Sequence, residues 1–264
     1  MVKTVKEIVD YRVMLFSLVK KDLSTRYRGS FLGFLWTFLN PLLMMFVYYF
    51  VFNTINQMGS PVEGESFLMF MFVAMLPWIF FSTALLGSTT SISGGGGLLK
   101  KIYFPRMILP ISVVVSNMMN YIFSLAILIP SLLFVQAPIT VNLLYFPLIL
   151  LIQVILTLGF CLLFSALNVY FRDLEHILNV LMMGWFFLTP VLYEVVGMNL
   201  SPTIERVMML NPMASIVMAF REILLRGNPP NFRLLLYSVV FGIVLLAVGG
   251  MIFSKLQKNF VEEI

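Results

Sequence analysis

The sequence has few charged residues, one cysteine and one histidine. Charged side chains make up only 11% of its 264 residues, whereas a soluble globular domain carries about a quarter. Cys161 stands alone in an apolar run, which excludes a disulfide framework within the chain and a thiolate metal site. With only one histidine, no paired-carboxylate motif and no G-x-S-x-G motif, no catalytic constellation is recognisable. The composition argues against a soluble enzyme.

Apolar residues are abundant instead, at 60% of the chain, and aromatic residues reach 15%. About 20 consecutive apolar residues are enough to cross the ~30 Å hydrocarbon core of a bilayer. Six runs reach or approach that length: 31–56, 67–92, 107–135, 143–169, 177–193 and 233–254. The pattern predicts an all-α integral membrane protein with six transmembrane helices. These form one bundle over residues 31–254, within a single transmembrane domain that covers 1–264.

Residues 1–29 differ from the rest of the chain because they are basic and because apolar residues recur in them at regular intervals. Apolar side chains recur there at helical spacing: Ile8, Tyr11, Leu15, Leu18, Val19 and Leu23. Polar residues fall opposite, which is typical of an amphipathic helix at a membrane interface. Residues 31–56 then carry no charged side chain at all. The chain is therefore predicted to lie on the membrane first and to enter it next.

The net charge of +5 is distributed in short basic clusters between the apolar runs. That distribution suits anionic lipid headgroups and membrane orientation, and it argues against a nucleic-acid partner. The positive-inside rule predicts that both termini, including the tail 255–264, are cytoplasmic. Segment 194–232 is an exception, because it carries Arg206, Arg221 and Arg226 on the predicted outer side. Long translocated loops obey the rule less strictly.

The same segment contains two apolar helical stretches, 203–210 and 214–225, separated by Asn211-Pro212. Both are too short to span a bilayer, so they are predicted to be short re-entrant helices on the outer side before the last span. Prolines inside the other apolar runs predict kinks, which are either ordinary irregularities of membrane helices or hinges that line a pathway. These residues are Pro41, Pro77, Pro130 and Pro190.

Segment 94–106, GGGGLLKKIYFPR, combines four glycines with a short basic and aromatic stretch. It lacks the G-x-x-x-x-G-K-[ST] pattern of a nucleotide-binding loop. One interpretation is a docking helix whose apolar side chains enter a groove on a soluble partner while basic side chains orient it. Its residues would be Leu98, Leu99, Lys100, Lys101, Ile102, Tyr103, Phe104 and Arg106. The alternative is a solvated loop lying along the membrane.

Four stretches carry a resemblance to a known family: 18–43, which contains RYRGSFLGFLWTFLNP, 98–112 with YFPR, 166–178 and 210–225. They resemble the membrane subunits of type-2 ABC exporters for polysaccharides, such as the O-antigen, capsule and teichoic-acid export permeases of bacteria. The resemblance covers nearly the whole chain in the right order. The sequence departs from the pattern at Gly94–Gly97, where more varied polar residues are expected.

The resemblance implies a homodimer in the bacterial cytoplasmic (inner) membrane that binds two copies of a separate ATPase subunit. It implies export of an undecaprenyl-linked polysaccharide by a permease with no enzymatic activity of its own. No cofactor is expected in this chain, since ATP and Mg²⁺ would bind the partner ATPase. The near absence of ionisable residues within the apolar runs also disfavours a proton-coupled transporter.

Two groups of residues are candidates for contact with such a substrate. Arg26 and Arg28 lie at headgroup depth, where they would either capture a lipid pyrophosphate at the entrance or simply anchor the first span. Aromatic side chains of the first and fifth runs would either line a glycan pathway or belong to interfacial belts and lipid-facing surfaces. These are Phe34, Trp36, Phe38, Tyr48, Tyr49, Trp185 and Phe186.

Two alternative functions stay open on the sequence alone. A permease for drugs or small lipids would share the architecture without accommodating a long polymer. A membrane-embedded glycosyltransferase would also be basic, aromatic and polytopic, but it would need acidic residues at the membrane surface. The candidates on the predicted outer side form no recognisable motif: Glu63, Glu65, Glu194 and Glu205.

Overall fold

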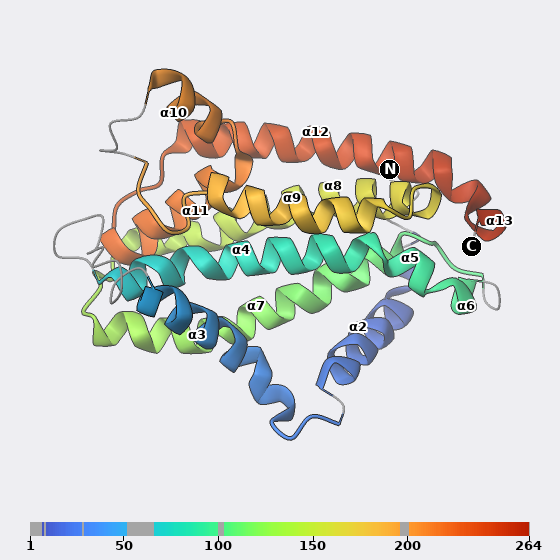
Figure 1. Ribbon diagram of the computed structural model, residues 1–264, viewed down its shortest axis with the longest axis horizontal. Helices are drawn as coiled ribbons and strands as arrows, with labels where there is room; N and C mark the ends of the chain where they lie inside the picture. The colour runs from blue at the N-terminus through green and yellow to red at the C-terminus, as the bar shows by residue number, and fades with distance from the viewer. Residues whose placement is uncertain are drawn as a thin grey trace.

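The computed structural model describes residues 7, 9–27, 29–51, 66–99, 103–195 and 201–263, and within these ranges every regular element is helical. Four helices are long and apolar enough to cross a membrane: α4 (Phe67–Thr89), α7 (Ile108–Phe134), α8 (Phe146–Tyr170) and α12 (Phe232–Leu256). They run roughly alongside one another in Figure 1. The all-helical membrane class is confirmed, and four of the six predicted spans have the necessary length.

The first predicted span begins later, and the fifth ends earlier, than the sequence suggested. α3 (Trp36–Tyr49) begins five residues later than expected, because Gly33 adopts a left-handed φ of 49° just before it. α9 (Leu174–Leu188) ends before Pro190 because the extended conformation of Thr189, which a following proline favours, breaks the helix. Pro190 was expected to kink a span, and it terminates the helix instead. Pro41, Pro77 and Pro130 do lie inside helices, as predicted.

α4 occupies the centre of the bundle, where it contacts α3, α7, α8, α9 and α11. Apolar side chains lie on all sides of it, so most of the helix can be buried. A side chain of α8 also ties this helix to the bundle, since Gln153 donates a 2.7 Å hydrogen bond to the carbonyl of Pro77. The helices of the candidate site are therefore arranged around a fixed central element.

α8 and α12 form a closely packed antiparallel pair. Backbone approach is possible because Gly159 and Gly249 face each other: a Cβ built on Gly249 would lie 2.6 Å from the carbonyl oxygen of Gly159. Only glycine permits such an approach of two helices. This pair covers one side of α4 and forms a frame for the bundle.

The two ends of the bundle differ. Short helices α5 (Ser91–Gly94), α6 (Gly96–Leu99) and α13 (Phe260–Glu263) gather at one end, on the right in Figure 1. The glycine run is largely helical, and Gly95 leaves room for the Leu109 side chain, which a Cβ would meet at 2.9 Å. The predicted docking helix is wrong at its C-terminal end, because residues 103–105 are not helical.

At the opposite end lie α10 (Pro202–Met209), α11 (Pro212–Arg221) and the π-helical turn η4 (Glu222–Arg226). Their bounds confirm the two short helices predicted before the last span, and the break between them is built by Asn211. Its side-chain oxygen caps α11 by accepting a 3.0 Å hydrogen bond from the Met213 backbone N–H. The residues of α11 are nearly all buried against α4, α8 and α12.

α2 (Arg12–Tyr27) is the predicted N-terminal helix, and it packs against α7. Phe104, Ile108 and Leu109 form a buried apolar cluster at this contact. The partly buried residues of the N-terminal segment that pack against the cluster are Tyr11, Met14, Leu15 and Leu18. A second apolar group on the helix, formed by Val9, Val13 and Phe16, is exposed. The apolar side predicted for a membrane surface is thus partly used for packing inside the subunit.

Candidate functional site

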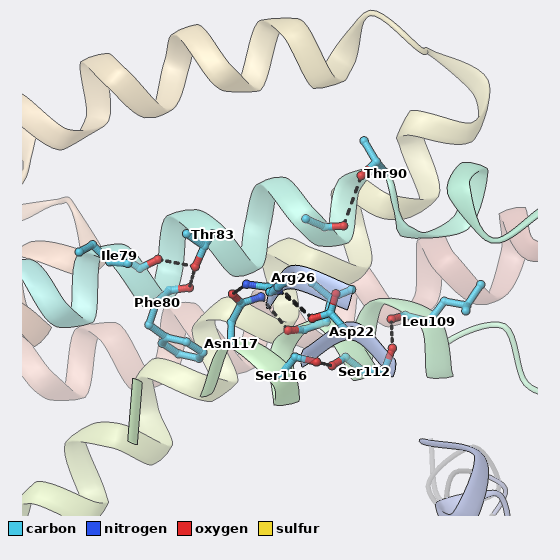
Figure 2. A network of polar contacts seen from close by, with 12 residues as sticks. Asp22, Arg26, Ile79, Phe80, Thr83, Thr90, Leu109, Ser112, Ser116 and Asn117 are labelled. Carbon is cyan, nitrogen blue, oxygen red and sulfur yellow. Dashed lines mark hydrogen bonds and ion pairs between the residues drawn. The ribbon is translucent and has the colours of Figure 1, made fainter. Parts of the chain in front are cut away.

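Arg26 lies in the last turn of α2 and is held by two partners (Figure 2). Its Nε and Nη2 each lie 3.0 Å from Oδ2 of Asp22, one turn earlier in the helix. Its Nη1 donates a 3.0 Å hydrogen bond to Oδ1 of Asn117 on α7. The Asn117 side chain is only 3% exposed, and its Nδ2 donates to the Val113 carbonyl, so its orientation is fixed. The guanidinium is therefore presented in a defined orientation.

Local sequence explains the position of Arg26 at the end of α2. Asp22 and Arg26 have the i, i+4 spacing of a helical ion pair, and a cation near the helix C-terminus also complements the helix dipole. Gly29, with a φ of 81°, then turns the chain away before α3 begins. The Arg26 side chain stays 31% exposed, so it remains accessible to a ligand. Its predicted companion, Arg28, lies outside the described residues.

A cavity of about 110 Å³ adjoins Arg26 between α2, α3, α4 and α7. Its wall mixes apolar surface with several polar side chains, which are uncommon among helices as apolar as these. The polar groups on it come from Arg26, Trp36, Thr37, Asn40, Thr83, Asn117, Asn120, Tyr121 and Ser124. Trp36 is oriented by a 2.9 Å hydrogen bond from its Nε1 to Oγ of Ser30.

A larger groove of about 530 Å³ continues along α3 and α4 toward α9. Aromatic side chains form part of its wall: Tyr48, Trp78, Phe186 and Phe187. The ring centroids of Tyr48 and Phe186 lie 5.6 Å apart, and those of Trp78 and Phe186 lie 5.7 Å apart. The groove and the small cavity share four lining residues, namely Asn40, Pro41, Ile79 and Thr83. The cavity that Arg26 lines and the aromatic groove therefore adjoin each other along α3 and α4.

The structure distributes the predicted pathway residues over several environments. Trp36 lines the small cavity, while Tyr48 and Phe186 line the groove. Trp185 points into the bundle, where its Nε1 donates to Asn211 Oδ1. Phe38 and Tyr49 are partly buried, and the side chain of Phe34 lies outside the described part of the chain. Sequence reasoning missed Trp78, which has no signal that separates it from the other aromatic residues of its run.

The predicted docking segment is divided between exposed and buried residues. Tyr103 is 92% exposed, whereas Phe104 is 4% exposed and packs against α2. A groove of about 420 Å³ runs beside them to the end of α12, and its wall includes Arg106 and Lys258. Lys100, Lys101 and Ile102 lie outside the described residues, as do the side chains of Leu98 and Leu99. Phe104 thus links an exposed surface to the helix that carries Arg26.

Two arginines at the α11 end of the bundle, Arg221 and Arg226, are held by contacts with other residues of the chain. Arg221 is 1% exposed, stacks over the Phe70 ring at 3.5 Å, and donates to the carbonyls of Phe70, Val191 and Tyr193. It therefore ties α11 to the start of α4 and to the chain after α9. Burial raises the pKa of the Tyr193 phenol, although the charge of Arg221 opposes part of the shift. The phenol stays protonated and donates to the carbonyl of Phe187.

Arg226 is paired as well. Its Nη2 lies 2.7 Å from Oε2 of Glu194, and its Nη1 lies 2.7 Å from Oε1 of Glu222. Glu194, one of the acidic residues that an enzyme of the membrane surface would need, is thus engaged in an ion pair. Among the described residues no group of three or more histidine, cysteine or acidic side chains is placed to hold a metal ion.

The site combines two features that no single stretch of sequence carries: an arginine, held by Asp22 and Asn117, on the wall of a small cavity, and an aromatic groove beside that cavity. Residues 14–225 match the family described as ABC-2 type transporter. The chain belongs to this family. Over its full length it is 40% identical to the whole O-antigen export system permease protein RfbA of Myxococcus xanthus.

Two further relatives of this ABC-2 type chain match over most of their length. An O-antigen export system permease protein RfbA of Klebsiella pneumoniae is 31% identical over 94% of both chains. The polysialic acid transport protein KpsM of Escherichia coli is 23% identical over 94% of this chain and 95% of that protein. The resemblance inferred from the sequence motifs is confirmed.

Proposed function

We propose that this chain is the transmembrane permease subunit of an ATP-driven exporter for a lipid-linked polysaccharide of the O-antigen type. Its ABC-2 type family and its relatives in O-antigen and polysialic acid export support the polymer class. The single observation that carries the proposal in the structure is the pair of adjoining pockets, the cavity and the groove. The cavity offers a cation at one end, and the groove offers aromatic faces that stack on sugar rings without requiring one sequence of sugars.

In this proposal the lipid diphosphate of an undecaprenyl carrier binds at Arg26. A guanidinium holds phosphate and carboxylate oxygens with the same planar pair of donors. A phosphate can therefore take the place of the Asp22 carboxylate, which occupies Nε and Nη2 in the structure. Because Asn117 retains the third donor, the arginine stays attached to α7 while the exchange occurs. The glycan then passes along α3 and α4 beside Tyr48 and Phe186.

The energy for transport comes from a separate ATPase subunit. We place its contact at the groove beside Tyr103, Arg106 and Lys258, where an exposed aromatic residue stands between basic side chains. Phe104 packs against α2, so a movement of this surface reaches the helix that carries Arg26. The working unit is a homodimer with two ATPase copies in the bacterial cytoplasmic membrane, with both termini on the cytoplasmic side.

Arg26→Lys tests the proposal, because lysine keeps the charge and the membrane topology but loses the planar pair of donors. We expect polymer export to fall about tenfold or more at matched expression, in line with the loss of one charge-assisted hydrogen bond or more. Arg12→Lys is the matched control, since Arg12 lies exposed in the same helix. Export by Arg26→Lys at the parental rate would leave this arginine with an anchoring role only.

A further inference from the structure

The C-terminal tail, residues 257–263, is held against the bundle. The short turn η5 (Gln257–Asn259) and α13 lie at the same end of the molecule as α5 and α6 (Figure 1). Phe260 is fully buried, and its ring centroid lies 5.4 Å from that of Phe253 on α12 and 6.3 Å from that of Tyr170 on α8. Terminal residues are poorly ordered unless such contacts tie them down. The tail is therefore an integral part of this end of the bundle.

Phe260 also supports the end of the docking segment. The guanidinium carbon of Arg106 lies over its ring, 6.0 Å from the ring centroid, which is within reach of a cation–π contact. The next residue, Met107, is 5% exposed and belongs to the same buried cluster as Phe260. The tail and the docking segment are far apart in the sequence, but they share one packing core.

The groove of about 420 Å³ beside Tyr103 lies between these two segments. Residues 103–107 form one part of its wall, and Gln257 and Lys258 of the tail form another. Lys258 is exposed. The two acidic residues that follow it, Glu262 and Glu263, do not line the groove. The tail therefore presents a lysine, but no carboxylate, to the groove.

The wall of this groove carries an excess of positive charge. Arg106 and Lys258 contribute two cations, and Glu7 contributes the one carboxylate among the described lining residues. The side chains of Arg106 and Lys258 form no ion pair or hydrogen bond with any residue that the structure describes. Arg26 and Arg226, in contrast, are both paired with carboxylates of this chain. Two cations placed in this way are complementary to an acidic group on a partner.

We infer that the ATPase subunit inserts an acidic side chain between the docking segment and the tail, where Arg106 and Lys258 pair with it, and that Phe260 is the positioning residue that holds Arg106 for this contact. The inference rests on the proposed function, since it requires the ATPase contact beside Tyr103. Tyrosine and arginine are among the residues that contribute most to binding at protein interfaces. Because the tail continues α12, a movement of α12 reaches the ATPase contact directly.

The test measures the Kd of the ATPase subunit for the full permease in nanodiscs, at low and at high salt concentration. The parental Kd is expected to rise with salt, because dissolved ions screen exposed charges. Lys258→Gln is expected to raise the Kd about two- to fivefold at low salt and to weaken its salt dependence. Lys258→Glu should raise the Kd further, because it opposes like charges. Lys255→Gln is the matched control, since Lys255 is exposed in the last turn of α12 and does not line the groove; it should bind like the parent.

Phe260→Leu separates the positioning of Arg106 from the stability of the subunit. Leucine keeps an apolar side chain in the buried cluster but offers no ring face to the guanidinium. Phe253→Leu is the matched control, because Phe253 is also fully buried in this cluster, whereas Arg106 lies over the ring of Phe260. Both variants should melt at similarly lowered temperatures. Only Phe260→Leu is expected to raise the Kd of the ATPase, by about two- to fivefold.

The outcomes separate this inference from the proposed function. If Tyr103→Ala weakens ATPase binding but both Lys258 variants bind like the parent, no acidic group pairs there; the inference is refuted and the contact beside Tyr103 stands. Equal Kd values for Phe260→Leu and Phe253→Leu would refute the positioning role of Phe260. If Tyr103→Ala and both Lys258 variants all bind the ATPase as the parent does, the ATPase contact of the proposed function is itself refuted.

Discussion

Replacing Gly249 by alanine perturbs the frame of the bundle at one point. The added Cβ would lie 2.6 Å from the carbonyl oxygen of Gly159 and 3.3 Å from the backbone nitrogen of Leu163 on α8. Contacts below 3.0 Å essentially never occur for real Cβ atoms, and both neighbours are backbone atoms that cannot rotate away. α12 must therefore move away from α8 by about 0.4 to 0.8 Å to reach a tolerable distance.

Separating two packed helices in this way costs about 1–3 kcal/mol, as for other overpacked interiors. For a chain of this size each kcal/mol lowers the melting temperature by about 2–4 °C, so the variant is expected to melt about 2–12 °C below the parent. Gly250→Ala is the matched control, because no atom outside its own backbone neighbourhood lies within 4 Å of the Cβ that it would add. It should be neutral or slightly stabilising, by about 0.4–1 kcal/mol, through helix propensity.

The assay is thermal unfolding of the purified permease in one detergent, with the parent and the two variants melted side by side. Because the two glycines are adjacent, differences in detergent binding or expression affect both variants alike. Equal melting temperatures for Gly249→Ala and Gly250→Ala would refute the close approach of α8 and α12 described above.

The remaining predictions concern the two ends of the bundle. Tyr103→Ala should reduce copurification with the ATPase subunit and leave the melting temperature of the permease unchanged, because Tyr103 is exposed. Phe104→Ala should instead lower the free energy of unfolding by about 3–5 kcal/mol, because it empties a buried site. Full copurification of the Tyr103→Ala variant would place the contact elsewhere. Arg221→Met should make the chain around 190–195 sensitive to protease, because three carbonyls lose their donor, each loss costing about 1–3 kcal/mol. Arg206 is exposed on α10, so Arg206→Met should leave the protease sensitivity of this segment unchanged. Equal protease sensitivity of the two variants would contradict the role of Arg221. The purified permease without its ATPase should not hydrolyse ATP, since the sequence contains no nucleotide-binding loop; turnover by a pure preparation would overturn this.

Much of the architecture could be predicted because its causes are local. Long uncharged runs dictate membrane helices, and α4, α7, α8 and α12 appear where the runs predicted them. The Asn211-Pro212 break separates α10 from α11 as expected, since asparagine caps a helix and proline suits its first turn. The errors were also local in origin: left-handed glycines delayed α3, and Pro190 ended a helix that it was expected to bend.

The sequence by itself determined that this chain is a helical membrane protein of a polysaccharide-exporter type, because hydrophobic length and short motifs carry that information. Only the tertiary structure decided which side chains meet. Arg26 and Asn117 are 91 residues apart, and the adjacent Trp185 and Phe186 face different surroundings. In helices that are apolar all round, no polar face marks the interior, so the rotation of each helix is set by packing against its neighbours. That rotation alone brings the side-chain oxygen of Asn117 on α7 to the guanidinium of Arg26 on α2.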